Sequence, residues 1–179
     1  MNPQEPEEFM RKTFKAILLM ALLLPVAAHA AAQAPVEWYV NMKYGFSIAY
    51  QKGFFLPQGE KADGSGQIFR SKDGKAIASV YGHEGKGASL TSVYNETLLK
   101  LPKDGWKIAH KSIRGDAFII RATKDTLVFY TKVMDNKQAS RRLVKFEAIH
   151  DASRGESYEQ AIYSMADSIK LLHAAPAAR

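Results

Sequence analysis

The order of strand-like and helix-like segments constrains the fold of this chain more than any other feature. Apolar residues recur at steps of three and four, which is typical of amphipathic helices, over residues 89–101 and 155–172. Shorter segments with alternating apolar residues predict strands at 44–50, 67–71, 75–81, 106–113, 116–122, 126–134 and 141–149. Because consecutive strands with few intervening helices favour antiparallel pairing, we predict an α+β fold, an antiparallel β-sheet packed between helices.

Turn and cap residues predict where these segments begin and end. The dipeptide Asp73-Gly74 predicts a hairpin with a type I′ turn, because its two central residues need positive φ angles. Ser89 or Thr91 is placed to cap the first helix, and Pro102 is expected to end it. The apolar segment 53–57 is expected to be a short turn.

Two apolar stripes predict which side chains enter the core. In the segment 44–50, one face of the strand carries Phe46, Ile48 and Tyr50. The last helix is expected to run from Gly155 to about Leu172, with one face made of Tyr158, Ile162, Met165, Ile169 and Leu172.

The start of the chain has the pattern of a secretory signal peptide. A basic pair, Arg11 and Lys12, precedes an apolar run over residues 16–26, and Ala28-His29-Ala30 forms a small-residue cleavage site. The apolar run is shorter than a membrane-spanning helix requires. Three acidic residues precede Met10, so we expect translation to start at Met10, the alternative being a long basic region.

This pattern divides the chain into four parts. Residues 1–30 are expected to be a signal peptide that is cleaved after Ala30, and residues 31–35 a flexible leader. Residues 36–172 are long enough for a single α+β domain with one core, and residues 173–179 are expected to be a frayed tail. The protein is therefore predicted to be periplasmic.

The absence of cysteine supports this location and excludes several kinds of chemistry. With no cysteine in the chain, disulfides, thiolate metal sites, cysteine nucleophiles and a lipid-modified amino-terminal cysteine are all excluded. An exported domain without disulfides depends on its hydrophobic core, which is more usual in a bacterial periplasm than outside a eukaryotic cell.

The chain is basic, with a formal net charge of +7 that loss of residues 1–30 leaves unchanged. A basic surface favours anionic partners, such as acidic proteins, peptidoglycan, anionic polysaccharides or membrane surfaces. The alternative is that the charge serves solubility alone. Nucleic acid is not expected as a partner of an exported protein.

The amino-terminal half resembles a known group of proteins. The run 44–50, Tyr-Gly-Phe-Ser-Ile-Ala-Tyr, followed by 63–74, Asp-Gly-Ser-Gly-Gln-Ile-Phe-Arg-Ser-Lys-Asp-Gly, is similar to exported bacterial proteins of the Mog1/PsbP-like group. The resemblance implies an antiparallel sheet between helices over most of residues 36–172. The chain departs from the pattern at Gln51, where the group has proline, and in the loop 62–66.

The same resemblance implies a function class. Members of the group assist assembly or bind other proteins and are not typically enzymes. The motifs consist of turns and core aromatic residues, so no catalytic residue follows from them.

Individual residues indicate no catalytic, cofactor or metal site. The chain has no Gly-x-Ser-x-Gly motif for a nucleophile, and the pairs His83-Glu84 and His150-Asp151 are neighbours that point to opposite faces of a strand. No two histidines have the spacing of a metal site. Asp63 and Ser65 suggest a calcium loop, but the closing bidentate acid is missing, so a plain turn is expected.

Partner binding is therefore the predicted function. Trp38, Phe54 and Phe55 fall outside clean alternation, and one or more of them is expected to line a surface groove for a partner, while Arg141 and Arg142 belong to the densest basic cluster. We predict a non-enzymatic periplasmic binding or accessory protein that acts through protein–protein contacts at the cell envelope. Two alternatives remain open: an inhibitor or immunity-type protein against an envelope hydrolase, and an enzyme whose site is assembled from scattered residues.

Overall fold

A computed structural model describes residues 35–84, 87–137 and 142–172. The predicted signal peptide, most of the leader and the tail lie outside these residues, as does Arg141. None of the described helices is long and apolar enough to cross a membrane.

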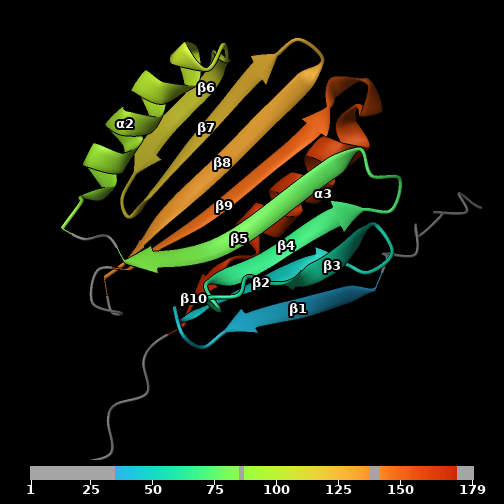
Figure 1. Ribbon diagram of the computed structural model, residues 1–179, viewed down its shortest axis with the longest axis horizontal. Coiled ribbons are helices and arrows are strands. Elements are labelled where there is room, and N and C mark those ends of the chain that lie inside the picture. Colours follow the sequence, from blue (N-terminus) through green and yellow to red (C-terminus); the bar gives the residue numbers. More distant parts are fainter. Residues whose placement is uncertain (1–34, 85–86, 138–141, 173–179) are drawn as a thin grey trace, which may run out of the picture. The chain divides into compact units, whose positions relative to one another are not determined.

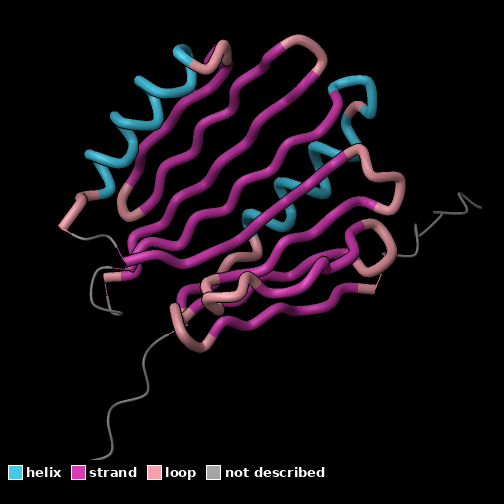
Figure 2. The backbone as a smooth tube through the Cα atoms, in the orientation of Figure 1, coloured by secondary structure: helices cyan, strands magenta, loops and turns pink. Residues whose placement is uncertain are grey.

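Two antiparallel sheets make up most of the described chain (Figures 1 and 2). The larger sheet has seven strands in the order β3-β4-β5-β9-β8-β7-β6, and the smaller has three in the order β1-β2-β10. The strands of the larger sheet are β3 (Phe55–Glu60), β4 (Gly66–Ser71), β5 (Ala76–Glu84), β6 (Lys107–Arg114), β7 (Ala117–Lys124), β8 (Leu127–Asn136) and β9 (Arg142–Asp151). The smaller sheet consists of β1 (Val36–Asn41), β2 (Phe46–Gln51) and β10 (Lys170–Leu171).

In the described part of the chain, two α-helices pack on the larger sheet. Helix α2 (Leu90–Lys103) contacts β6, β7 and β8, and α3 (Glu156–Asp167), which follows a 3-10 turn at Ala152–Arg154, contacts β9 and also β2. Ser89 caps α2 as expected, because its hydroxyl accepts a hydrogen bond from the Ser92 N–H at 3.0 Å. The sheet-dominated α+β class predicted from the sequence is confirmed.

The core forms two clusters on opposite faces of the larger sheet, because side chains alternate along each strand. On β7, Phe118 and Ile120 pack in the cluster of α2, whereas Arg121, the next residue along, points to α3 and pairs with Glu159. The second cluster joins α3 and the smaller sheet to β4, β5, β8 and β9. The strand residues predicted to face the core, Phe46, Ile48 and Tyr50, are all buried there.

Three boundary expectations are corrected by the structure. The expected turn at 53–57 continues into strand β3, and residues 36–41, which had no assigned structure, form β1. The last helix ends at Asp167 rather than Leu172, because the Ser168 side chain bonds to the backbone of Ala49 and the chain then pairs with β2.

The hairpin between β4 and β5 is present, but its turn is not type I′. A type I′ turn needs a positive φ at both of its central residues. Gly74 has a positive φ of 70°, but Asp73 does not, because Asp125 is the one described non-glycine residue with a positive φ. The Gly74 N–H donates to the Ser71 carbonyl at 2.9 Å instead, which places Lys72 and Asp73 in the centre of the turn.

Candidate functional site

One row of side chains crosses the larger sheet from an exposed half to a covered half. Strand register places Leu56, Arg70, Ile77, Ile149 and Phe129 directly opposite one another on successive strands β3, β4, β5, β9 and β8. Directly opposed residues of antiparallel strands lie on the same face. Phe129 is buried in the cluster of α2, but Leu56, Ile77 and Ile149 are exposed. The helix therefore covers only part of this face.

The uncovered part of this face, which we call the open face, gathers exposed apolar side chains. It consists of Leu56, Ile68, Ile77, Leu127 and Ile149, each exposed although large and apolar. Scattered exposed apolar residues are ordinary, but several on one face of one sheet make this face a candidate interaction surface.

The open face is hollowed where it meets α2. A hollow of about 330 Å³ lies over Ile77, Phe129 and Ile149, and a second of about 490 Å³ lies between α2 and strands β5 and β9. The second hollow is lined by Val93 and Lys100 of α2 together with residues of the sheet, among them Phe129, Glu147 and Ile149. Because the two hollows share Phe129, Glu147 and Ile149, they adjoin and form one groove over the sheet beside α2.

A tyrosine and a glutamate fix the polar floor of this groove. The Tyr81 hydroxyl donates to Glu147 Oε2 at 2.9 Å, and Lys145 Nζ lies 2.6 Å from Glu147 Oε1. Burial, and then the charge of Glu147, raises the pKa of the Tyr81 phenol above its ordinary value. Both carboxylate oxygens of Glu147 are engaged, so this arrangement holds the floor in place rather than offering a general base.

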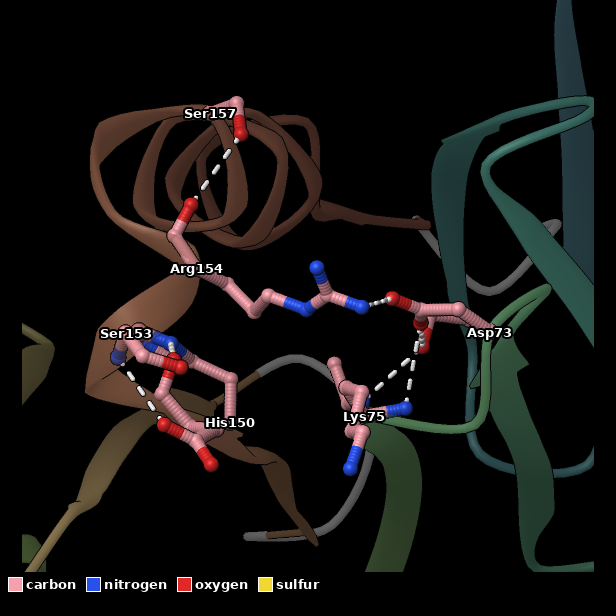
Figure 3. A network of polar contacts seen from close by, with 9 residues as sticks. Asp73, Lys75, His150, Ser153, Arg154 and Ser157 are labelled. Carbon is pink, nitrogen blue, oxygen red and sulfur yellow. Dashed lines mark hydrogen bonds and ion pairs between the residues drawn. The ribbon is translucent and has the colours of Figure 1, made fainter.

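A second polar network holds the turn at one end of the open face (Figure 3). Asp73 lies in the turn before β5, and its carboxylate accepts from the Arg154 guanidinium at 2.5 Å, the Ser71 hydroxyl at 2.8 Å and the Lys75 N–H at 3.1 Å. Hydrogen bonds from Tyr158 and Ser71, with the Lys75 N–H and the Arg154 charge, lower the pKa of Asp73 below its ordinary value. The network ties the turn to the start of α3.

Cationic side chains border the open face, although the larger hollow is also lined by the acidic residues Glu84, Glu96 and Asp104. Arg70 stands in the row of apolar side chains, Lys75 lines the smaller hollow and Lys100 lines the larger one. Within the described part of the chain, neither Arg70 nor Lys100 takes part in an ion pair. These charges are therefore available to an anionic partner.

The structure separates the residues that the sequence groups as a binding site. Trp38 is 51% exposed on β1, whereas Phe55 is 1% exposed in the core, which corrects the expectation that its side chain lines a surface groove. Phe54 is half-buried, with its ring 4.8 Å from that of Tyr158. Arg142 begins β9, where its backbone pairs with Glu84 and Asn136. A role for Trp38 in partner binding stays a prediction.

The histidines are placed as the sequence indicates. His150 is buried, and its Nδ1 lies 3.1 Å from the Asp151 backbone oxygen rather than from the carboxylate. His83 Nδ1 lies 3.3 Å from the backbone oxygen of Glu84 in the same way. Among the described residues, no group of three or more possible metal ligands comes together.

Sequence reasoning missed the open face. A weak signal exists, because Ile77 and Ile149 are large apolar residues at positions that alternate with the core-facing ones on β5 and β9. A strand that is apolar on both faces is ordinarily buried on both.

The arrangement of sheets and helices matches solved structures. The Ran-binding protein Mog1p of Saccharomyces cerevisiae superposes with a TM-score of 0.57 over 78% of this chain and 97% of that chain. The fold is similar to that of Mog1p. A point mutant of protein Mog1 gives a TM-score of 0.56 with the same coverage, and both are 11% identical to this chain.

The match supports the Mog1-like, sheet-dominated fold that the sequence resemblance implied. At 11% identity the match concerns the fold alone. No family model and no curated protein sequence matches the chain.

Proposed function

We propose that this chain is a non-enzymatic accessory protein that binds a partner protein on its open face, at the cell envelope of a bacterium. The single observation that carries the proposal is the gathering of Leu56, Ile68, Ile77, Leu127 and Ile149 on one uncovered sheet face. The signal-peptide pattern of residues 1–30 supports export.

Apolar burial supplies the affinity in this proposal. Ile77 and Ile149 lie opposite each other beside the groove, and each is about two-fifths exposed. Covering the exposed part of such a side chain stabilises a complex by about 1 kcal/mol. Anchors of this kind near the centre of a surface, with a polar surround, are the usual arrangement of a protein interface.

Charge favours an acidic partner. The basic side chains Arg70, Lys75 and Lys100 border the apolar residues, and the whole chain carries +7. A partner segment with apolar and acidic residues would match both features. The groove beside α2 is concave, which suits a protuberant protein segment better than a flat membrane surface.

The solved neighbours support a binding role. Mog1p of Saccharomyces cerevisiae, which has this fold, is a Ran-binding protein. A fold that binds a protein in one case is a suitable scaffold for binding another, and the partner of this chain is determined by its own open face.

A capture experiment with a matched variant pair tests the proposal. The protein is immobilised and exposed to periplasmic and solubilised-envelope extract, and bound proteins are eluted with rising salt. Ile77→Asp changes the open face, whereas Ile113→Asp changes an isoleucine of β6 that is similarly exposed, 38% against 43%. We expect one acidic protein to survive high salt on the wild type and on I113D and to be lost on I77D.

Other outcomes have definite meanings. Equal capture by I77D and I113D would place binding elsewhere and overturn the open face as the site. A captured hydrolase that loses activity would select the inhibitor alternative. Fractionation of cells tests export separately. Recovery of the protein in the cytoplasm, with residues 1–30 still attached, would contradict the envelope location.

A further inference from the structure

The two sheets have four edges, and three of them are protected against pairing with another chain. At β3, Pro57 and an irregular register reaching Glu60 interrupt the edge. At β6, a bulge between Ile108 and His110 accompanies the basic residues Lys107, Lys111 and Arg114. The edge strand β10 has only two residues. Proline, bulges, lysines and short length are the usual protections of an exposed edge.

The fourth edge, β1, lacks proline, a bulge, lysine and short length, and the charge of its inward residue Glu37 is paired with Lys52 at 2.6 Å. Its six residues pair with β2 in unbroken register and include no proline, lysine or arginine. In Figure 1, β1 forms the lower border of the coloured ribbon, and no strand of the described residues pairs with its outer edge. An edge of this kind presents unpaired backbone N–H and C=O groups to another strand.

The side chains of β1 are arranged opposite to those of an ordinary surface strand. Val36, Trp38 and Val40 point outward and are about half exposed, whereas the polar side chains between them point inward. The inward ones are bonded, with Glu37 accepting from the Tyr50 hydroxyl and Tyr39 donating to Glu60. The outward apolar side chains stay about half exposed, even at Trp38, where Lys170 Nζ lies 5.1 Å from the ring centroid.

We propose that β1 pairs antiparallel with β1 of a second copy of this chain, so that the two smaller sheets join into one. A closed dimer has a two-fold axis, and such an axis relates two edge strands in antiparallel orientation. This inference is independent of the open face, which lies on the larger sheet.

Residue pattern selects the register of this pairing. With Trp38 opposite Trp38 of the second copy, Val36 lies opposite Val40 of that copy, so every outward apolar residue of β1 meets another. On the inward side Glu37 then lies opposite Tyr39 of the second copy. If the two strands shift by two residues in one direction, Glu37 of one copy lies opposite Glu37 of the other, and the two negative charges repel each other. If they shift by two residues in the other direction, Val36 lies opposite no residue of the second β1.

The absence of cysteine allows a direct test of this register. A single Trp38→Cys variant carries the only thiol of the chain. Opposed residues of antiparallel strands are about 4.5–5.5 Å apart between Cα atoms, which is within the reach of a disulfide. We expect W38C to form a covalent dimer under mild oxidation at low protein concentration. Leu99→Cys, at a position 67% exposed on α2, is the control and stays monomeric on a non-reducing gel.

A charge exchange tests the same contact without a covalent bond. Light scattering during gel filtration should give a dimer mass for the wild type and a monomer mass for Trp38→Glu and for Trp38→Lys alone. Mixing the two variants should restore a dimer, because opposite charges then face each other across the axis. A thermal melt of each variant verifies that it is folded. A monomeric wild type, W38C that crosslinks no more than L99C, or a mixture that stays monomeric overturns the proposal.

Discussion

Burial distinguishes two aromatic residues that look alike in the sequence. Phe55 is enclosed in the core, whereas Trp38 lies half exposed on β1 with Lys170 Nζ 5.1 Å from its ring centroid. We expect Phe55→Ala to lower the free energy of unfolding by about 3–5 kcal/mol, since it removes a buried ring and leaves a cavity. Trp38→Ala should cost about 1 kcal/mol or less. Urea unfolding at low protein concentration measures both, and equal losses would contradict the assigned burial.

A buried tyrosine gives the protein a defined alkaline behaviour. Burial, and then the hydrogen bond to Glu37, raises the pKa of Tyr50 to about 12 from an ordinary value of 10.0. Because the folded state holds the proton more tightly, this contribution to stability is complete below pH 10 and is lost as the pH rises through about 12. We expect Tyr50→Phe to remove late-titrating phenolate absorbance and leave the rise near pH 10 unchanged. A loss of the early component instead would show that Tyr50 is solvated.

At the residue scale, the sequence predicts which side chains are buried only where large apolar residues alternate regularly with small ones. Phe46, Ile48 and Tyr50 alternate with small residues, and all three are buried as predicted. Phe54 and Phe55 are adjacent, so periodicity gives no reason to bury one and not the other. Which of the two rings is buried depends on how β3 is oriented, and the pairing of β3 with β4 determines that orientation.

At the scale of elements, the contact between the β4–β5 turn and the 3-10 turn before α3 controls acid stability. The pKa of Asp73 is lowered in the folded state, so its contribution is present above the ordinary pKa near 3.8 and is lost as the pH falls toward the lower folded value. We expect Asp73→Asn to be less stable than the wild type at neutral pH, since it removes the charge opposite Arg154. The difference between the two proteins should shrink during acid titration followed by circular dichroism. A constant difference down to low pH would contradict this role.

Two elements escaped prediction for physical reasons. In β1 the apolar side chains Val36, Trp38 and Val40 alternate but face outward, so alternation alone would assign them to the core and the bonded polar side chains to the surface. In the last helix, Ile169 keeps helical spacing from Met165 although the chain has already turned toward β10. Its burial in the core comes from a long-range contact that no local pattern reports.

At the scale of the whole molecule, element order predicts the sheet-dominated α+β class, but neither the division into two sheets nor the site. Consecutive strands and two separate helices predict an antiparallel sheet with helices on it, whichever face each helix covers. The open face depends on where α2 stops, which leaves Ile77 exposed and Phe129 buried although both lie in one row across the sheet. Coverage of a sheet by a helix is a tertiary property and has no signature in either strand.

Charge distribution gives a prediction that belongs to the molecule as a whole. If the net charge of +7 only aids solubility, the position of a removed charge does not matter for partner binding. If the proposed function is correct, charges at the open face matter most, because they attract an acidic partner to it. The double variants Arg70→Gln/Lys75→Gln and Lys107→Gln/Lys111→Gln remove the same charge from the open face and from the β6 edge.

We expect the association rate with the captured partner to fall several-fold at low salt for R70Q/K75Q and to change little for K107Q/K111Q. The difference should narrow as salt is added, since the Debye length falls from about 30 Å at 0.01 M to about 8 Å at 0.15 M. Surface plasmon resonance over this salt range measures both rates. An equal fall in the association rates of the two variants would mean that the partner responds only to the net charge of the protein. The affinity of the open face would then come entirely from its apolar side chains.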